Sequence, residues 1–181
     1  MVDDWAKTIL EIDLIDGLRH GVCVSNLTYL IAKKLGLSDE ECNNLAVAGM
    51  VHDIGKLRLS SYLYGRNSNG MIIEEIQYMR KHSRLGYEIL KKYSYNDAIC
   101  EAVLYHHENY DGSGYPDNLK AEKIPLGARI MRVADAFIAL ISERPYREAY
   151  DFDSAISIMI EDVKEYDMQV FPAFMDVIHE D

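Results

Sequence analysis

The chain has 181 residues, 49% of them hydrophobic and 27% charged, with a formal net charge of −11. These proportions predict a soluble globular protein with a hydrophobic core, and the length predicts one domain over residues 1–181. The charge argues against binding to polymeric nucleic acid or an anionic membrane surface, and no stretch approaches the roughly 18 apolar residues of a membrane span. An acidic N-terminus without a signal-peptide pattern and three widely spaced cysteines favour a cytoplasmic protein with reduced, buried thiols.

The first part of the chain has the pattern of consecutive helices. Apolar residues recur three and four positions apart over 22–35 and stop at Gly36, which predicts a helix with a glycine cap. Ser38–Glu41 forms a capping box and predicts a second helix that runs to about Ile54. The polar, glycine-containing stretch 65–70 predicts a loop.

Helical patterns continue in the middle of the chain. Residues 71–93 predict one helix or two, with Gly86 at a packing contact. Asn96 predicts the cap of a helix that ends near His107. Two glycines and two prolines exclude a regular helix over 108–125.

The last third of the chain completes an all-helical pattern. An apolar stripe begins at Leu126 and stops before Pro145, and two further helices are expected at about 153–166 and 172–179. The apolar stripe over 155–163 favours helix packing, with a homodimer face as the alternative. Because no alternating strand pattern stands out, the sequence predicts an all-α helical bundle.

Five of the six histidines belong to a series that also contains aspartates. Asp16 and His20 are four residues apart and share one helix face, which suits two ligands of one metal ion or an ordinary solvated surface. His52 and Asp53 follow a mainly apolar run, where unpaired polar groups are costly. They predict either metal ligands or a pair that caps the helix or forms a salt bridge. His82 lies in a polar patch and, taken alone, predicts a surface histidine.

Two further positions extend this series. His106 and His107 are adjacent, and since neighbouring helical residues differ by about 100° in direction, they could serve two different ions. Asp135 interrupts an apolar stripe, where a buried carboxylate needs a cation or hydrogen-bond donors; a salt bridge to Arg129 or Arg132 is the structural alternative. Imidazole and carboxylate groups are ligands of iron, manganese and zinc, so the whole series predicts more than one metal ion.

The order of these motifs resembles the HD-GYP family, a subgroup of the HD superfamily of metal-dependent phosphohydrolases. The segments that carry the resemblance are His20, His52-Asp53-Ile54-Gly55-Lys56, His82-Ser83-Arg84-Leu85-Gly86, His106 to Pro116 with its Gly114-Tyr115-Pro116 signature, and Ala134-Asp135 to Arg144-Pro145-Tyr146-Arg147. The resemblance covers about residues 16–150, with C-terminal helices over 151–181. It implies an all-α HD-domain helical bundle with an HD-GYP extension.

The resemblance also implies a bacterial signalling enzyme, a phosphodiesterase that hydrolyses cyclic di-GMP to pGpG or GMP. The positions that correspond to metal ligands are Asp16, His20, His52, Asp53, His82, His106, His107 and Asp135. Those that correspond to substrate contacts are Lys56, Tyr115, Arg144 and Arg147. The catalytic set implied in this way is His52, Asp53 and Lys56. The chain departs from the family pattern at Asp16, where some members have glutamate, and at Ile138, where aspartate is common.

Ligand counting supports a centre with several metal ions. The candidate side chains exceed what one six-coordinate ion could use while leaving a position for water, so two ions are expected, with a third if Asp16 reaches one. Two ions roughly 3.5–4 Å apart could share Asp53 and a bridging water, whose deprotonated form would attack phosphorus in line. Lys56 and Arg144 would assist in balancing phosphate charge. Iron or manganese is favoured, and zinc also fits.

Two alternatives to this activity remain at the level of the sequence. The first is a phosphohydrolase that acts on another cyclic dinucleotide, such as cyclic GMP-AMP, or on a nucleotide. The second is a non-catalytic module that binds cyclic di-GMP or a signalling partner. Retention of the main ligand positions favours the enzyme over the module.

Overall fold

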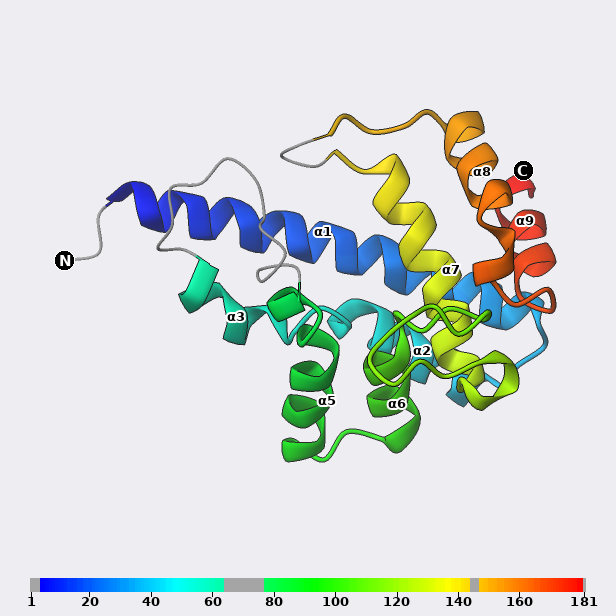
Figure 1. Cartoon of the computed structure of the whole chain (residues 1–181), viewed down its shortest axis with the longest axis horizontal. Helices are drawn as coiled ribbons and strands as arrows, with labels where there is room; N and C mark the ends of the chain where they lie inside the picture. Colours follow the sequence, from blue (N-terminus) through cyan, green and yellow to red (C-terminus); the bar gives the residue numbers. More distant parts are fainter. Residues whose placement is uncertain (1–3, 64–76, 144–146, 181) are drawn as a thin grey trace.

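The longest helix, α1 (Asp4–Lys34), lies along the long axis of the molecule (Figure 1). The computed structural model describes residues 4–63, 77–143 and 147–180. Helix α2 (Asp39–Val51) begins with the predicted capping box: the backbone N–H of Glu41 donates to Ser38 Oγ, and the N–H of Ser38 donates to Glu41 Oε2 at 2.9 Å. Helix α2 then packs along α1. A Cβ at Gly49 would lie 2.8 Å from Ser25 Cα, so this glycine allows the two backbones to approach closely.

The next helices among the described residues lie below α1 in the view of Figure 1. They are α3 (Lys56–Leu63), α5 (His82–Lys92) and α6 (Asp97–Tyr105). Helices α5 and α6 pack against each other, and α6 also packs against α2. Asn96 caps α6 as predicted, because its Oδ1 accepts a hydrogen bond from the N–H of Ala98 at 2.8 Å.

Helix α7 (Leu126–Ile141) follows the short 3₁₀ helix η1 (Ala121–Lys123) and packs against α1 and α6. Helices α8 (Phe152–Glu161) and α9 (Phe171–His179), with the 3₁₀ helix η2 (Val163–Glu165), lie at the end of the molecule opposite the start of α1 (Figure 1). The core continues between these elements, where Phe137 of α7 contacts Phe174 of α9 edge to face. Phe174 is fully buried, so this C-terminal segment is part of the hydrophobic core.

The all-α prediction is confirmed, since the described residues contain helices and no β-strand. The boundaries of the individual helices agree less well with the prediction than the fold class does. The helix predicted to reach Ile54 ends at Val51, and the following four residues form turns before α3, which the sequence did not predict. The predicted loop 65–70 lies outside the described residues. None of the described helices has the length and hydropathy that crossing a bilayer requires.

Several burial predictions were wrong. Cys42 and Cys100 are buried as expected, but Cys23 is exposed. Val22 and Leu30, expected on the apolar stripe of the first helix, are 43% and 49% exposed. A three-and-four spacing covers a broad arc of a helix, whereas α2 and α7 bury only part of that arc.

Candidate metal centre and adjoining cavity

The candidate ligands converge because several helices end or begin at the same place. His52 and Asp53 directly follow α2, and His82 is the first residue of α5. A Cβ at Gly55 would overlap the carbonyl oxygen of His82 and lie 2.7 Å from the backbone nitrogen of Gly86. Only glycine therefore lets the turn after α2 lie against the first turn of α5, which brings His82 to Asp53. The predicted packing role of Gly86 is found at this contact.

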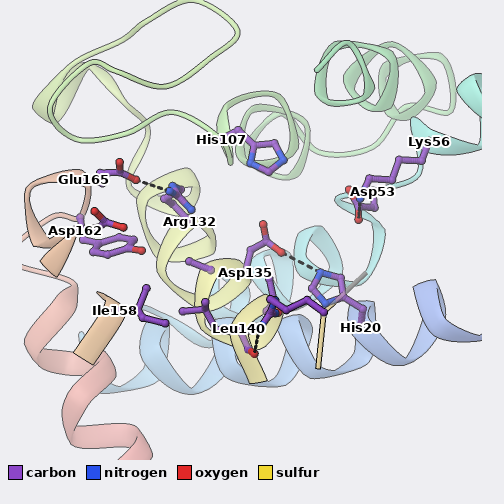
Figure 2. Close-up of a pocket in the computed structure, with 14 residues that line it drawn as sticks. His20, Asp53, Lys56, His107, Arg132, Asp135, Leu140, Ile158, Asp162 and Glu165 are labelled. Atoms are coloured by element: carbon purple, nitrogen blue, oxygen red, sulfur yellow. Dashed lines mark hydrogen bonds and ion pairs between the residues drawn. The ribbon is translucent and has the colours of Figure 1, made fainter. Parts of the chain in front are cut away.

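One side of the cluster joins α1, α2 and α7. Nε2 of His20 lies 2.9 Å from Oδ1 of Asp135. Nε2 of His52 lies 3.6 Å from the same oxygen and 3.4 Å from Oδ2 of Asp53. Figure 2 shows His20 and Asp135 directed toward one another from their two helices. These ligand atoms are close enough for one ion to bind several of them at once.

The other side of the cluster contains three imidazoles. Nε2 of His82 lies 3.3 Å from Nε2 of His106 and 3.2 Å from Nε2 of His107. It also lies 3.4 Å from Oδ1 of Asp53. Asp53 therefore presents one carboxylate oxygen to His52 and the other to His82, as a residue shared by two ions would. His82 is only 2% exposed, so its interpretation as a surface histidine was wrong.

The protonation of three of these histidines is fixed by a common backbone contact. Each lies 2.7 Å, through Nδ1, from the carbonyl oxygen three residues earlier; the pairs are His52 with Gly49, His82 with Met79, and His106 with Val103. Because a carbonyl only accepts, Nδ1 carries a hydrogen in all three, and Nε2 faces the cluster with a free lone pair whenever the ring is neutral. This arrangement is typical of metal-binding histidines, whose other nitrogen donates to a backbone carbonyl.

The nitrogen and oxygen atoms that face the centre of the cluster are better suited to coordinate a cation than to hydrogen-bond to one another. With hydrogen on Nδ1, the Nε2 atoms of His82 and His106 face each other with lone pairs at 3.3 Å. Oδ1 of Asp53 and Nδ1 of His20 are buried and lack a hydrogen-bond partner among the described residues. Unpaired buried polar atoms are unfavourable, and a divalent ion would satisfy the inward-facing nitrogens and carboxylate oxygens.

The electrostatics separate the histidines into two groups. Burial lowers the pKa of His82, places that of His106 well below its usual range, and lowers that of His107 to about 3. These rings are therefore neutral at pH 7, the form that binds metals. Burial opposes the charge of His52 too, but the nearby carboxylates of Asp53 and Asp135 outweigh it and raise its pKa to about 9. The cluster therefore combines neutral imidazoles with a region that attracts positive charge.

A cavity of about 390 Å³ opens beside the cluster (Figure 2). This volume lies within the usual range of small-molecule sites. From the cluster, His20, Asp53, His107 and Asp135 line it. The rest of the wall is formed by Lys56, Arg132, Ala136, Ala139, Leu140, Arg147, Ile158, Asp162, Glu165 and Tyr166. The cavity therefore runs from the candidate metal centre along α7 to α8 and η2.

Of the predicted substrate contacts, two line this cavity. Lys56 donates to Oδ2 of Asp53 at 2.5 Å and is 41% exposed, so its ammonium group lies between the cluster and solvent. Arg147 donates to the backbone carbonyl oxygens of Ala139, Leu140 and Glu148, which fixes its guanidinium at the end of α7. Both remain predictions as substrate contacts.

The other two predicted contacts are placed differently. Tyr115 stacks on the His107 ring, with 4.7 Å between the ring centroids. The guanidinium of Arg80 lies over the Tyr115 ring, 5.1 Å from its centroid. The loop that carries Tyr115 closes tightly, since a Cβ at Gly114 would overlap the carbonyl oxygen of His107. Arg144 lies outside the described residues.

Two further expectations concern aspartates. Asp16 is exposed, lies 3.7 Å from Arg19, and is absent from the groups of described residues that could hold an ion. The structure thus brings together the other predicted ligands without Asp16. The salt-bridge alternative for Asp135 was wrong: its partners are His20 and His52, whereas Arg129 pairs with Asp167 and Arg132 pairs with Glu165.

Sequence reasoning did not assign site roles to residues on the far wall of the cavity. Arg132 lies one helical turn before Asp135 and therefore on the same face of α7, a spacing that could have identified it. Glu165 and Asp162 come from the segment after α8, and only the packing of that segment against α7 brings them to the cavity. No local pattern in the sequence indicates this.

Comparisons with known proteins agree with this description. A family model described as an HD domain matches residues 6–170. A relative from Xanthomonas campestris, named cyclic di-GMP phosphodiesterase response regulator RpfG, is 42% identical over 139 residues, which cover 75% of this chain and 36% of the relative. A relative from Vibrio cholerae, named 3'3'-cGAMP-specific phosphodiesterase 1, is 35% identical over 157 residues, which cover 84% of this chain and 36% of the relative.

A solved structure shares the fold. The Bdellovibrio bacteriovorus protein Bd1817, described as an HDG"Y"P protein, superposes with a TM-score of 0.71 at 23% identity, covering 91% of this chain and 53% of that one. The chain spans little more than a third of the length of the two curated relatives above.

Proposed function

Since this chain belongs to the HD-domain family and carries the motifs of its HD-GYP members, we propose that it is a metal-dependent phosphodiesterase that hydrolyses a cyclic dinucleotide. The observation that carries the proposal is the cluster of inward-facing imidazole nitrogens and carboxylate oxygens that opens directly into a cavity. A purely structural cluster would have no need of an adjoining cavity.

The residues proposed to hold metal are His20, His52, Asp53, His82, His106, His107 and Asp135. Two divalent ions, iron or manganese in the first instance and zinc as an alternative, fit this mixture of ligands. Bound ions would lower the pKa of a coordinated water and neutralise charge on the phosphate oxygens. Asp16 would act as a metal ligand only if a third ion were bound and its side chain turned toward that ion.

The chain's own residues would position the substrate and its charge. Lys56, at the edge of the cavity, would pair with a phosphate oxygen, as would Arg144. Arg147 would line the path of the substrate. Tyr115, stacked on His107, would help to fix that ring and contact the substrate beside it. His20, from α1, and Arg147, after α7, line one cavity, which supports the proposal that residues 1–181 form one domain.

Cyclic di-GMP is the proposed substrate, with pGpG or GMP as product. The V. cholerae relative named for 3'3'-cGAMP favours that dinucleotide as the second candidate. Both share a ring of two phosphodiesters, so the metal centre would treat them alike and the bases would decide between them.

The test is chromatographic product analysis. Metal-free protein is loaded anaerobically with Fe(II), Mn(II) or Zn(II) and incubated with cyclic di-GMP or 3'3'-cGAMP. Appearance of linear dinucleotide or mononucleotide is expected. The double variant His52→Ala/Asp53→Ala should lose turnover by at least about a thousandfold. His179→Ala is the matched control, because this histidine is exposed at the end of α9, and its activity should equal that of the parent. Loss of turnover in the control, or retention in the double variant, would contradict the assignment.

A further inference from the structure

Arg132 is held rigidly on the wall of the cavity. Its Nε donates to Oδ1 of Asn109 at 2.7 Å, and its Nη2 donates to Oε2 of Glu165 at 2.7 Å. The guanidinium also lies over the ring of Tyr166, 5.4 Å from the centroid. Figure 2 shows Arg132 between Glu165 on one side and Asp135 and His107 on the other. A long, flexible side chain is therefore fixed in one orientation beside the candidate metal centre.

The fixed guanidinium keeps unused donors. Arginine has five N–H groups, and Nη1 has no hydrogen-bond partner within the described part of the chain. The charge of Arg132 is already balanced by Glu165, whose carboxylate is 23% exposed. A guanidinium whose charge is balanced in this way has less electrostatic attraction for a phosphate. It is well suited to donate to neutral acceptors in a fixed geometry.

The cavity that Arg132 lines also has apolar and acidic walls, a combination that suits a base with hydrogen-bond donors. Ala136, Ala139, Leu140 and Ile158 provide an apolar surface, and the carboxylates of Asp162 and Glu165 line the cavity beside it. Arginine pairs with the O6 and N7 acceptors of guanine, and carboxylates accept from donors such as its N1–H and N2 amino group. Adenine has an amino group in place of O6, so it offers no second acceptor to the same arginine.

We propose that Arg132 binds the guanine base of the substrate and makes this site selective for guanine-containing cyclic dinucleotides. The proposal rests on the proposed phosphodiesterase function and specifies its substrate: one phosphodiester lies at the metal centre while a base extends along α7 toward Asp162 and Glu165. Arg132 then acts on specificity, and the cluster acts on the phosphodiester.

The test compares three phosphodiesters: cyclic di-GMP, cyclic di-AMP, which carries adenine in place of guanine, and bis(p-nitrophenyl) phosphate, which has no base. Arg132→Met should lower kcat/KM for cyclic di-GMP by about 5- to 150-fold, the range of one bidentate arginine–guanine pair. Turnover of the other two should change less than about threefold. Arg132→Lys keeps a charge opposite Glu165 but cannot form the bidentate pair, so it should lose most of the same discrimination.

Arg58→Met is the matched control. Arg58 forms an exposed pair with Glu88 at 3.6 Å and does not line the cavity, so all three substrates should be turned over at the parent rates. Thermal melting of each variant establishes that it is folded before its kinetics are compared.

The outcomes separate this inference from the proposed function. If Arg132→Met lowers kcat/KM equally for all three substrates, Arg132 supports the geometry of the metal centre and does not recognise the base. If kcat/KM is unchanged for all three, Arg132 takes no part in the reaction. Either result overturns the inference. Calorimetric titration of cyclic di-GMP and cyclic di-AMP into metal-free protein gives an independent readout. Selective binding of cyclic di-GMP that Arg132→Met abolishes, without hydrolysis of any diester, would contradict the proposed function alone. Equal binding of both dinucleotides by the parent would contradict the inference.

Discussion

Replacing Gly55 by alanine should damage the candidate metal centre without touching a ligand. The added Cβ would overlap the carbonyl oxygen of His82 and lie 2.7 Å from the backbone nitrogen of Gly86. Both obstacles are backbone atoms of α5, so no side chain can rotate away to make room. The turn after α2 and the first turn of α5 must move apart, and His82 moves with α5.

The size of this movement sets the expected effect. Restoring an ordinary contact of 3.4 Å to the Gly86 nitrogen alone requires a shift of about 0.7 Å, and the closer overlap with the His82 carbonyl oxygen requires a larger one. Metal–ligand distances tolerate only about 0.2 Å, so His82 would no longer share an ion with His106 and Asp53 in the same geometry. Overpacking a close-packed contact costs about 1–3 kcal/mol, and a clash between backbones belongs near the upper end. Metal affinity should fall by at least about tenfold.

Two measurements test this reasoning. Denaturant unfolding of the metal-free protein gives the loss of stability, and competitive titration with a metal-binding dye gives the affinity. Gly17→Ala is the matched control, because nothing lies within 4 Å of a Cβ at that position of α1. It should leave metal affinity unchanged and stabilise the helix by about 0.5–1 kcal/mol. Parental stability and parental metal affinity in Gly55→Ala would refute the argument.

Three further predictions concern stability and reactivity. Asp167→Ala should destabilise the protein by about 3–5 kcal/mol in denaturant unfolding, because it leaves the mostly buried guanidinium of Arg129 without its carboxylate; a loss below 1 kcal/mol would contradict this. Removal of metal by a chelator should lower the Tm, since free metal at 100 times its Kd stabilises by about 2.7 kcal/mol; an unchanged Tm would argue against a bound ion. In the native protein a thiol reagent should modify Cys23 first, because it is exposed, whereas burial raises the pKa of the Cys42 and Cys100 thiols; mass spectrometry showing all three modified equally fast would be inconsistent with the fold.

The helices and the candidate ligands could be predicted because both depend on local patterns. The capping box at Ser38 and the cap at Asn96 satisfy backbone N–H groups within a few residues, so the sequence alone locates these helix starts. The order of histidines and aspartates was sufficient to identify the motifs. Helix α3 was missed because its eight residues lack a periodic apolar pattern long enough to distinguish it from a turn.

The burial of individual side chains and the identity of their hydrogen-bond and ion-pair partners could not be predicted, because both depend on which helices pack against each other. The polar neighbours of His82 made it look exposed, yet the first turn of α5 faces the end of α2 and buries the ring. The partner of Asp135 was expected among arginines of its own helix. It is instead His20, which lies 115 residues earlier in the chain on α1. Helical periodicity gives the direction of a side chain but not the element that lies opposite.

The departure of the sequence from its family at Ile138 illustrates the same distinction. The resemblance to the family leads to the expectation of an aspartate there, so this chain lacks a carboxylate that family members commonly have. Ile138 is only 8% exposed and packs in the hydrophobic core, whereas α7 lines the cavity through Arg132, Asp135, Ala136, Ala139 and Leu140. An aspartate at a position with this environment would need partners that the core does not supply. Ile138 therefore contributes to the packing of α7. The polar side chains that this helix places on the cavity wall are Asp135 and, one turn earlier, Arg132. Selectivity among cyclic dinucleotides is accordingly expected to depend on Arg132 and not on position 138.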